Sequence, residues 1–221
     1  MTAPSPTRLR SGHVASELAD EFPGLRVRFA TVTQGPRSSP PALVRRLAAL
    51  SDRYRGAGVV SLRTRPVPSA FRTFFRQIGL DPDVERIPAE AVAVARLLHG
   101  GFRSTGLIAD ACLVAVVETG VAVWALDADG VDERDLGIRV CTGADVAALG
   151  PAQAPPPGSL VVADGRRVHA LLFGDPLPGR AVSAATRRVT LYSVGVDGVP
   201  VIHVEEAMWT VLELLGAAGG G

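Results

Sequence analysis

The segment from residue 106 to residue 127 constrains the fold most, because it is apolar but interrupted at four positions. The interrupting residues are Asp110, Glu118, Gly120 and Asp127. They divide the run into a helix, a glycine at which the helix ends, and a short strand. A membrane-spanning helix needs about 20 consecutive apolar residues, so this segment is not one. It is typical of the core of a globular domain with polar residues at its corners.

The composition indicates a folded protein. The chain has 221 residues, 47% of them hydrophobic, which is enough to bury a core in one large domain or two small lobes. We expect a domain at residues 15–215, a flexible Pro-, Ser- and Thr-rich N-terminus at 1–14, and a disordered Gly/Ala tail at 216–221. No run resembles a signal peptide or membrane anchor, which predicts a cytoplasmic protein. Cys112 and Cys141 are interpreted as small buried apolar residues rather than a disulfide or metal pair.

The basic residues are all arginine: there are 23, and the sequence contains no lysine. This excludes Schiff-base catalysis and lysine-containing phosphate loops. The charge is also uneven, because residues 41–80 hold eight arginines and a single acid, Asp52. Such a segment could contact phosphates, or its arginines could simply be solvated on helix surfaces. The candidates for RNA contact are Arg45, Arg46, Arg53, Arg55, Arg63 and Arg65.

Hydrophobic periodicity predicts helices in the first half of the chain and strands in the second. Helices are expected at residues 16–22, 40–54, 69–78, 88–98 and 204–215, besides the one in the central segment. Strands are expected at 25–33, 137–141, 159–163, 168–173 and 188–196. His99 falls in the last turn of its helix, where it is expected to cap carbonyls. The order of elements favours an α+β fold, with mixed sheets and flanking helices, over a doubly wound parallel sheet.

Common catalytic signatures are missing from the sequence. It has no Gly-x-Ser-x-Gly elbow, no His-Glu-x-x-His, no Walker loop, no Cys-x-x-Cys and no Gly-x-Gly-x-x-Gly. The four histidines, His13, His99, His169 and His203, lie far apart along the chain, so we expect neither a metal cluster nor a cofactor. Motifs alone therefore assign no enzyme class.

Five short blocks in series carry a resemblance to a known family. They are residues 22–27 (FPGLRV), 75–82 (FRQIGLDP), the central segment with Asp110, Gly120 and Asp127, 161–164 (VVAD), and 182–189 (VSAATRRV). In this order and at these intervals they resemble the B3/B4 domain, the tRNA-binding and editing domain of the phenylalanyl-tRNA synthetase beta subunit. The likeness runs from about residue 16 to 215 and is to free-standing, single-domain members.

The resemblance implies a mixed α/β domain with a pocket between two halves, and tRNA as partner, with neither DNA nor a membrane. In the synthetase this domain hydrolyses tyrosine wrongly attached to tRNA, and free-standing members are regarded as editing factors in trans or as tRNA binders. A second hydrolytic site raises fidelity where an apolar pocket cannot reject an added hydroxyl. Trp124 stands where the family pattern has a pocket histidine, and Asp175 is the stand-in for the glutamate that reads the tyrosine hydroxyl.

Three functions remain open at this stage. The first is a trans-acting aminoacyl-tRNA deacylase, the second a non-catalytic tRNA- or RNA-binding module, and the third a small-molecule- or protein-binding domain. Each candidate pocket residue also has a structural interpretation as a helix cap, a turn, core or a strand-edge hydroxyl. No residue is assigned as catalytic. The pocket candidates are Asp110, Trp124, Asp127, Asp175 and Thr186.

Overall fold

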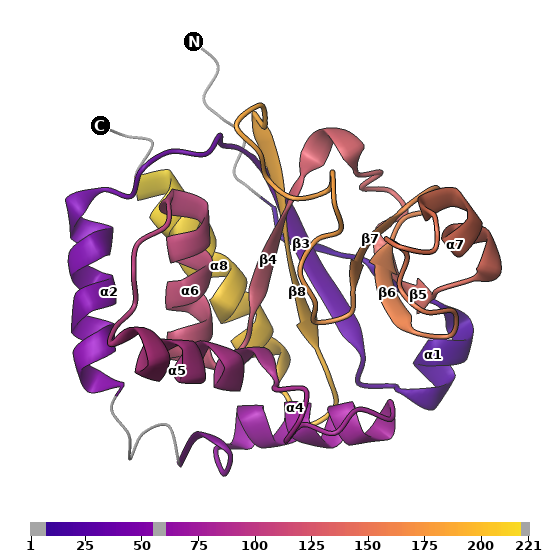
Figure 1. Ribbon diagram of the computed structural model, residues 1–221, viewed down its shortest axis with the longest axis horizontal. Helices are drawn as coiled ribbons and strands as arrows, with labels where there is room; N and C mark the ends of the chain where they lie inside the picture. The colour runs from indigo at the N-terminus through magenta and orange to yellow at the C-terminus, as the bar shows by residue number, and fades with distance from the viewer. Residues whose placement is uncertain (1–7, 55–60, 218–221) are drawn as a thin grey trace.

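The computed structural model describes residues 8–54 and 61–217, which form an α+β structure with two four-stranded sheets. Figure 1 shows sheet A in the middle, the helices α2, α5, α6 and α8 on one side of it, and sheet B with α7 on the other. No helix among the described residues is long and apolar enough to cross a membrane. The α+β architecture with flanking helices is therefore confirmed.

Sheet A is antiparallel throughout and has the strand order β1-β3-β8-β4. Its central pair joins β3 (Arg26–Thr33) to β8 (Arg188–Gly195) along the full length of both strands. β1 (Arg10–Ser11) and β4 (Val123–Asp127) form the two edges. Seven of the eight residues of β8 are buried, because α8 packs on one side of sheet A and the sheet B half lies on the other.

Sheet B is mixed, with the strand order β2-β5-β6-β7. Its strands are β2 (His13–Val14), β5 (Gly137–Val140), β6 (Leu160–Ala163) and β7 (Val168–Leu171). β2 pairs with β5 in parallel, and the remaining pairs are antiparallel. A short 3-10 helix, η1 (Ala128–Gly130), follows β4 on the way to this sheet.

The helices are α1 (Ser16–Glu21), α2 (Pro41–Arg53), α4 (Pro66–Gln77), α5 (Pro88–His99), α6 (Leu107–Thr119), α7 (Gly143–Leu149) and α8 (Val201–Ala217). Proline begins α2, α4 and α5, where its fixed φ and missing N–H are tolerated. α6 packs between α2 and α8 and is buried on most sides, which explains its almost continuous apolar sequence.

Three expectations change. Residues 10–14, expected within a flexible N-terminus, instead form β1 and β2, because the Pro- and Ser-rich composition is confined to earlier positions while Arg10–Val14 can pair at sheet edges. The helix α7 was not predicted. α8 begins at Val201 and reaches Ala217, so it extends into the expected tail. Residues 1–7 and 218–221 lie outside the described part of the chain.

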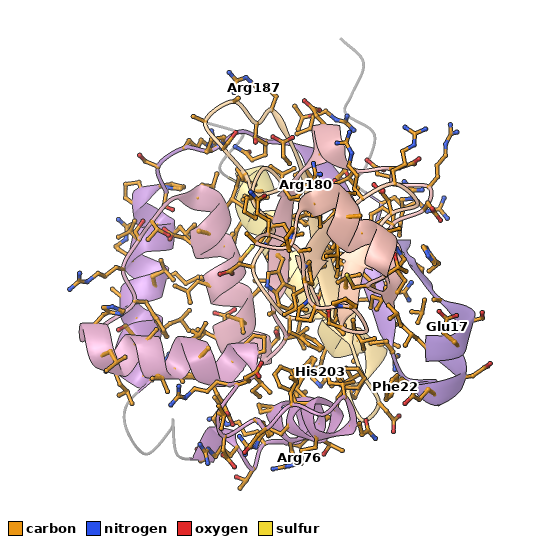
Figure 2. The ribbon with its side chains drawn as sticks, turned by 45° about the vertical axis from the view of Figure 1, so that its right-hand side comes forward. Glu17, Phe22, Arg76, Arg180, Arg187 and His203 are labelled. Carbon is orange, nitrogen blue, oxygen red and sulfur yellow. The ribbon has the colours of Figure 1, made fainter. Side chains whose placement is uncertain are left out.

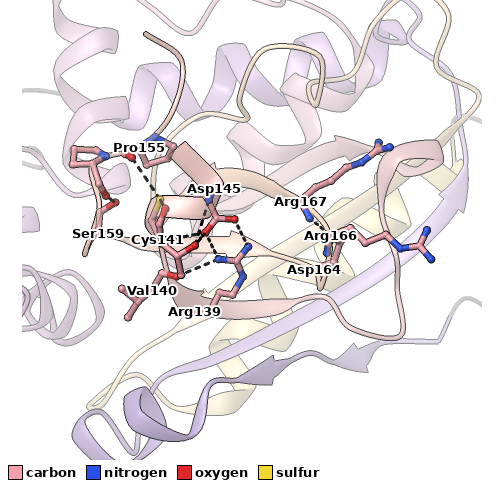
Figure 3. A network of polar contacts seen from close by, with 11 residues as sticks. Arg139, Val140, Cys141, Asp145, Pro155, Ser159, Asp164, Arg166 and Arg167 are labelled. Carbon is pink, nitrogen blue, oxygen red and sulfur yellow. Dashed lines mark hydrogen bonds and ion pairs between the residues drawn. The ribbon is translucent and has the colours of Figure 1, made fainter. Parts of the chain in front are cut away.

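The aspartate of the VVAD block, Asp164, organises the turn between β6 and β7. Its carboxylate accepts hydrogen bonds from the backbone N–H groups of Asp132, Arg166 and Arg167 at 2.8–2.9 Å, two of which are drawn in Figure 3. His169 Nε2 lies 2.9 Å from the same side chain, and both residues are buried. Burial raises the pKa of Asp164, but these hydrogen bonds outweigh it and hold the pKa below its usual value. Asp164 is therefore a structural residue.

Candidate binding pocket

A pocket of about 830 Å³ opens where the N-terminus of α6 meets the segment before α2, the strand β4 and the loop after residue 180. This volume lies within the range of about 300–1,000 Å³ that is typical of small-molecule sites. The described lining carries both aliphatic side chains and hydroxyl groups. The aliphatic side chains are those of Leu107, Ile108, Val123, Pro176 and Val182; the hydroxyls belong to Ser38, Ser39, Ser104 and Thr105.

The N-terminus of α6 is anchored by Gly106. This residue has φ +136°, a conformation that glycine adopts readily, and it places Leu107 N–H 2.9 Å from the carbonyl oxygen of Arg37. The carbonyl of Gly106 accepts from the N–H of Asp110 at 2.8 Å. The intervening amides, those of Ile108 and Ala109, have no hydrogen-bond acceptor among the described residues. Two backbone donors are therefore available at the pocket.

Asp110 lies behind the pocket lining rather than in it. It is 1% exposed, and its Oδ2 accepts hydrogen bonds from the hydroxyls of Ser39 and Ser104, each at 2.5 Å. Its Oδ1 accepts from the N–H of Thr105 at 2.9 Å. One buried carboxylate thus joins the segment before α2 to the turn that precedes α6, and it fixes the direction of two pocket hydroxyls.

Trp124 points away from this pocket. Val123 and Ala125 line it, and side chains alternate along a strand, so Trp124 lies on the opposite face of sheet A. There its ring stacks on Tyr192, with centroids 5.4 Å apart and planes 15° apart, and it also contacts Phe173. The space between Trp124, Phe71 and Phe173 cannot hold a water molecule. The side of sheet A that faces sheet B is thus filled at this point.

Phe173 is the centre of this aromatic cluster. Its ring meets those of Phe71, Phe74 and Phe75 at centroid distances of 5.2–5.9 Å. Among the described residues other than glycine, it alone has a positive φ, 64°. This backbone conformation is uncommon for a bulky side chain, and the packing of the ring among its neighbours stabilises it.

Asp127 and Thr186 lie in contact, although they are far apart in the sequence. The Thr186 hydroxyl donates to Asp127 Oδ2, while Oδ1 of Asp127 accepts from the N–H of Asp129 at 3.1 Å. The N–H of Asp127 bonds the carbonyl of Arg180 at 2.9 Å. These contacts hold the loop of residues 181–186 against the end of β4, where Ala181 and Val182 form part of the pocket wall.

Asp175 is exposed and lies next to Pro176, a lining residue. The Tyr192 hydroxyl is buried and has no hydrogen-bond partner within residues 8–54 and 61–217. Burial raises the pKa of Tyr192 strongly, and the negative charge of Asp175 raises it further. The structure therefore places none of the five candidate residues in the pocket lining. Asp110 lies behind it, Asp127 and Thr186 support one wall, Asp175 flanks it, and Trp124 lies on the other face of the sheet.

The arginine candidates divide into paired and unpaired side chains. Arg46 forms a bidentate ion pair with Glu118 at 2.6 and 3.1 Å, and Arg63 pairs with Asp83 at 2.9 Å. Arg45, Arg53 and Arg65 are exposed and form no ion pair with any described residue. Arg55 lies outside the described residues.

Arginines are spread widely over the molecule, and Figure 2 shows Arg187 and Arg76 near opposite ends of it. Near the pocket, Arg37 supplies the one charged side chain of the described lining, and the exposed Arg103 directly precedes Ser104. No acidic side chain lines the pocket. Within residues 8–54 and 61–217, no three histidine, cysteine or acidic side chains gather to hold a metal ion.

The sequence reasoning missed the pocket hydroxyls and Arg37. The sequence signal near these residues was the run Ser104-Thr105-Gly106 before an apolar helix, which is typical of a helix start. No sequence feature near Ser39 indicated that Ser39 lies beside the helix α6. The sequence matches no protein-family model, and no curated protein is significantly similar to it.

Proposed function

We propose that this protein binds tRNA in the manner of a free-standing B3/B4 domain and receives the aminoacylated 3′ end in the pocket at the N-terminus of α6. The observation that carries the proposal is the pocket itself. It combines aliphatic side chains, hydroxyls, two backbone amides and Arg37, and no acidic side chain that would repel a nucleic acid is among its described lining residues. The five sequence blocks that resemble the family support it.

The unpaired arginines of α2 supply a surface for the phosphate backbone. Arg45 and Arg53 are eight residues apart on the exposed side of the helix, which separates them by about 12 Å along the axis. α2 begins at Pro41, shortly after the pocket residues Ser38 and Ser39. A strand of RNA could therefore follow α2 while its end enters the pocket.

Salt dependence of tRNA binding tests the proposal. Each neutralised phosphate contributes about −0.7 to −0.9 to the slope of log K against log salt concentration. Replacing both Arg45 and Arg53 by alanine should reduce the magnitude of the slope by about 1.4–1.8. Arg46→Ala is the matched control, because this arginine of the same helix is already held by Glu118. Undetectable or salt-insensitive binding of the wild-type protein would contradict the proposal.

Hydrolysis of the aminoacyl ester is a second candidate, and the free amides of Ile108 and Ala109 favour it. Such donors stabilise the oxyanion that develops when water attacks an ester carbonyl. The lining holds no histidine or carboxylate to serve as general base, so we expect slow turnover. A panel of mischarged tRNAs is the appropriate substrate set.

Ala109→Pro tests the contribution of one of these amides. It removes an N–H that has no hydrogen-bond acceptor among the described residues. The third position of a helix accepts proline in this protein, because α4 has proline at its first and third positions. The loss of one oxyanion donor should slow hydrolysis about a hundredfold or more. An unchanged rate, or no deacylation of any tRNA by the wild-type protein, would leave binding alone.

A further inference from the structure

The hydroxyls of Ser39 and Ser104 can act only as hydrogen-bond acceptors toward the pocket. Each of them lies 2.5 Å from the same carboxylate oxygen of Asp110. A carboxylate only accepts, so both hydroxyl hydrogens point at Asp110 and the serine lone pairs remain for a ligand. Because both serines line the pocket and share one partner atom, a single donor group can contact both.

Asp110 provides negative charge directly behind these two oxygens. It forms no ion pair with any described residue, although it is buried. Hydrogen bonds from Ser39, Ser104 and the N–H of Thr105 stabilise the carboxylate, as does the N-terminal end of α6. A positively charged donor seated on the two serines would therefore be attracted by a carboxylate that forms no ion pair within the described part of the chain.

The rest of the pocket complements the other parts of an amino acid. The amides of Ile108 and Ala109 are donors suited to a carbonyl oxygen, and they lie one turn or less from Asp110 in the same helix. The aliphatic side chains of the lining, such as Val123 and Val182, suit an uncharged apolar side chain. Among the described residues, no aromatic and no acidic side chain lines the pocket.

We infer that the pocket recognises an α-amino acyl group with an apolar aliphatic side chain, its primary ammonium group seated on Ser39 and Ser104 in front of Asp110. This inference deepens the proposed function and rests on it for the tRNA to which the acyl group is attached. The recognition of the acyl group itself depends only on the pocket, so it can be measured without RNA.

The test compares L-leucinamide with N-acetyl-L-leucinamide by titration of the intact protein, followed by NMR or calorimetry. Acetylation removes the ammonium charge while the side chain and the carbonyl remain. Binding of L-leucinamide should be at least tenfold tighter than that of the acetylated compound. The Ser39→Ala, Ser104→Ala double variant should lose this preference. Ser38→Ala is the matched control, because Ser38 lines the pocket but does not bond Asp110, and it should keep the preference.

Two results with the wild-type protein would overturn the inference. Equal binding of both compounds would mean that the pocket recognises only apolar surface. Binding of adenosine without binding of L-leucinamide would assign the serine oxygens to ribose hydroxyls. If the double variant does not fold, the comparison in the wild-type protein decides alone. Salt-dependent tRNA binding without selectivity for the ammonium group would overturn this inference and leave the proposed function intact. Selectivity for the ammonium group without tRNA binding would overturn the proposed function and leave this inference intact.

Discussion

Thr186 donates a hydrogen bond from its buried hydroxyl to the carboxylate of Asp127, and this contact fastens the loop of residues 181–186 to the end of β4. Thr186→Val keeps the shape of the side chain but removes the donor. Because a hydrogen bond to a charged group contributes about 1.5–3 kcal/mol, the free energy of unfolding should fall by that amount. Urea denaturation measures it.

The control for this loop is Thr73→Val, since Thr73 is exposed on α4 and bonds only the carbonyl of Ser69 in its own helix. It should change the free energy of unfolding by less than about 0.5 kcal/mol. If Thr186→Val proves as mild as the control, the contact does not hold the loop.

Arg72 and Glu90 form a buried ion pair between α4 and α5, with nitrogen–oxygen distances of 2.9 and 3.0 Å. In Arg72→Met, Glu90 stays buried. Its remaining ion-pair partner among the described residues is Arg63, whose Nε lies 3.8 Å from Oε1 of Glu90. Removal of one partner of such a pair costs about 3–5 kcal/mol, whereas replacing both by apolar residues is often nearly neutral. We therefore expect Arg72→Met to be strongly destabilising and added Glu90→Leu to restore most of the loss.

Arg46→Met is the surface comparison for this experiment. Its pair with Glu118 is partly exposed, 42% and 29% for the two side chains, so it should contribute no more than about 1 kcal/mol. Equal losses in Arg72→Met and Arg46→Met would contradict the interpretation of the buried pair as a structural contact between α4 and α5.

His169 should make stability depend on pH. Burial lowers its pKa, and the hydrogen bond with Asp164 only partly opposes this. The unfolded chain therefore takes up a proton near pH 6.5, while the folded state resists it until a lower pH. Stability should fall as the pH decreases below about 6.5, through the window down to the folded pKa.

His169→Gln should flatten this slope below about pH 6.5, as measured by denaturant unfolding at each pH. His99→Gln serves as control, because His99 is exposed at the end of α5. A slope that persists unchanged in His169→Gln would assign the pH dependence to other groups.

Trp124 is expected to matter for stability rather than for binding. Trp124→Ala removes the ring that stacks on Tyr192 and contacts Phe173, and should cost about 3 kcal/mol, the lower end of the range for large aromatic side chains. Trp124→Phe should retain most of the stability. tRNA affinity should be unchanged in Trp124→Phe. A stable Trp124→Ala protein that has lost tRNA binding would instead place Trp124 in the site.

Local pattern predicted most elements of the fold. The interrupted apolar run folds as α6, ends at Gly120 in the left-handed conformation, and continues as β4. His99 caps its helix, with Nδ1 2.8 Å from the carbonyl of Ala95. The helix α7 was missed, although its capping box of Thr142 and Asp145 was present in the sequence. The short turn of apolar residues after it gave too little periodicity to indicate a helix.

The site was less predictable, because it depends on contacts between distant segments. Asp110 was singled out, but its contact with Ser39 is set by how the segment before α2 packs against α6, and its contact with Ser104 by the turn before α6. The direction of Trp124 depends on which face of sheet A lies toward sheet B. A strand's alternation shows that Val123 and Trp124 point to opposite sides, but it does not indicate which side is hollow.

The place of β8 at the centre of sheet A has a consequence for how the protein is made. β3 is synthesised early and can pair with β1, yet the strand that covers its other edge, β8, ends at Gly195, and β4 forms its ladder with that same strand. During synthesis, the edges of β3 and β4 that face β8 therefore stay unpaired until the ribosome has passed residue 195. Such long-range pairing folds slowly and exposes apolar strands to aggregation in the meantime. Truncated chains that stop before β8 should consequently be recovered as insoluble or chaperone-bound material rather than as a smaller folded domain.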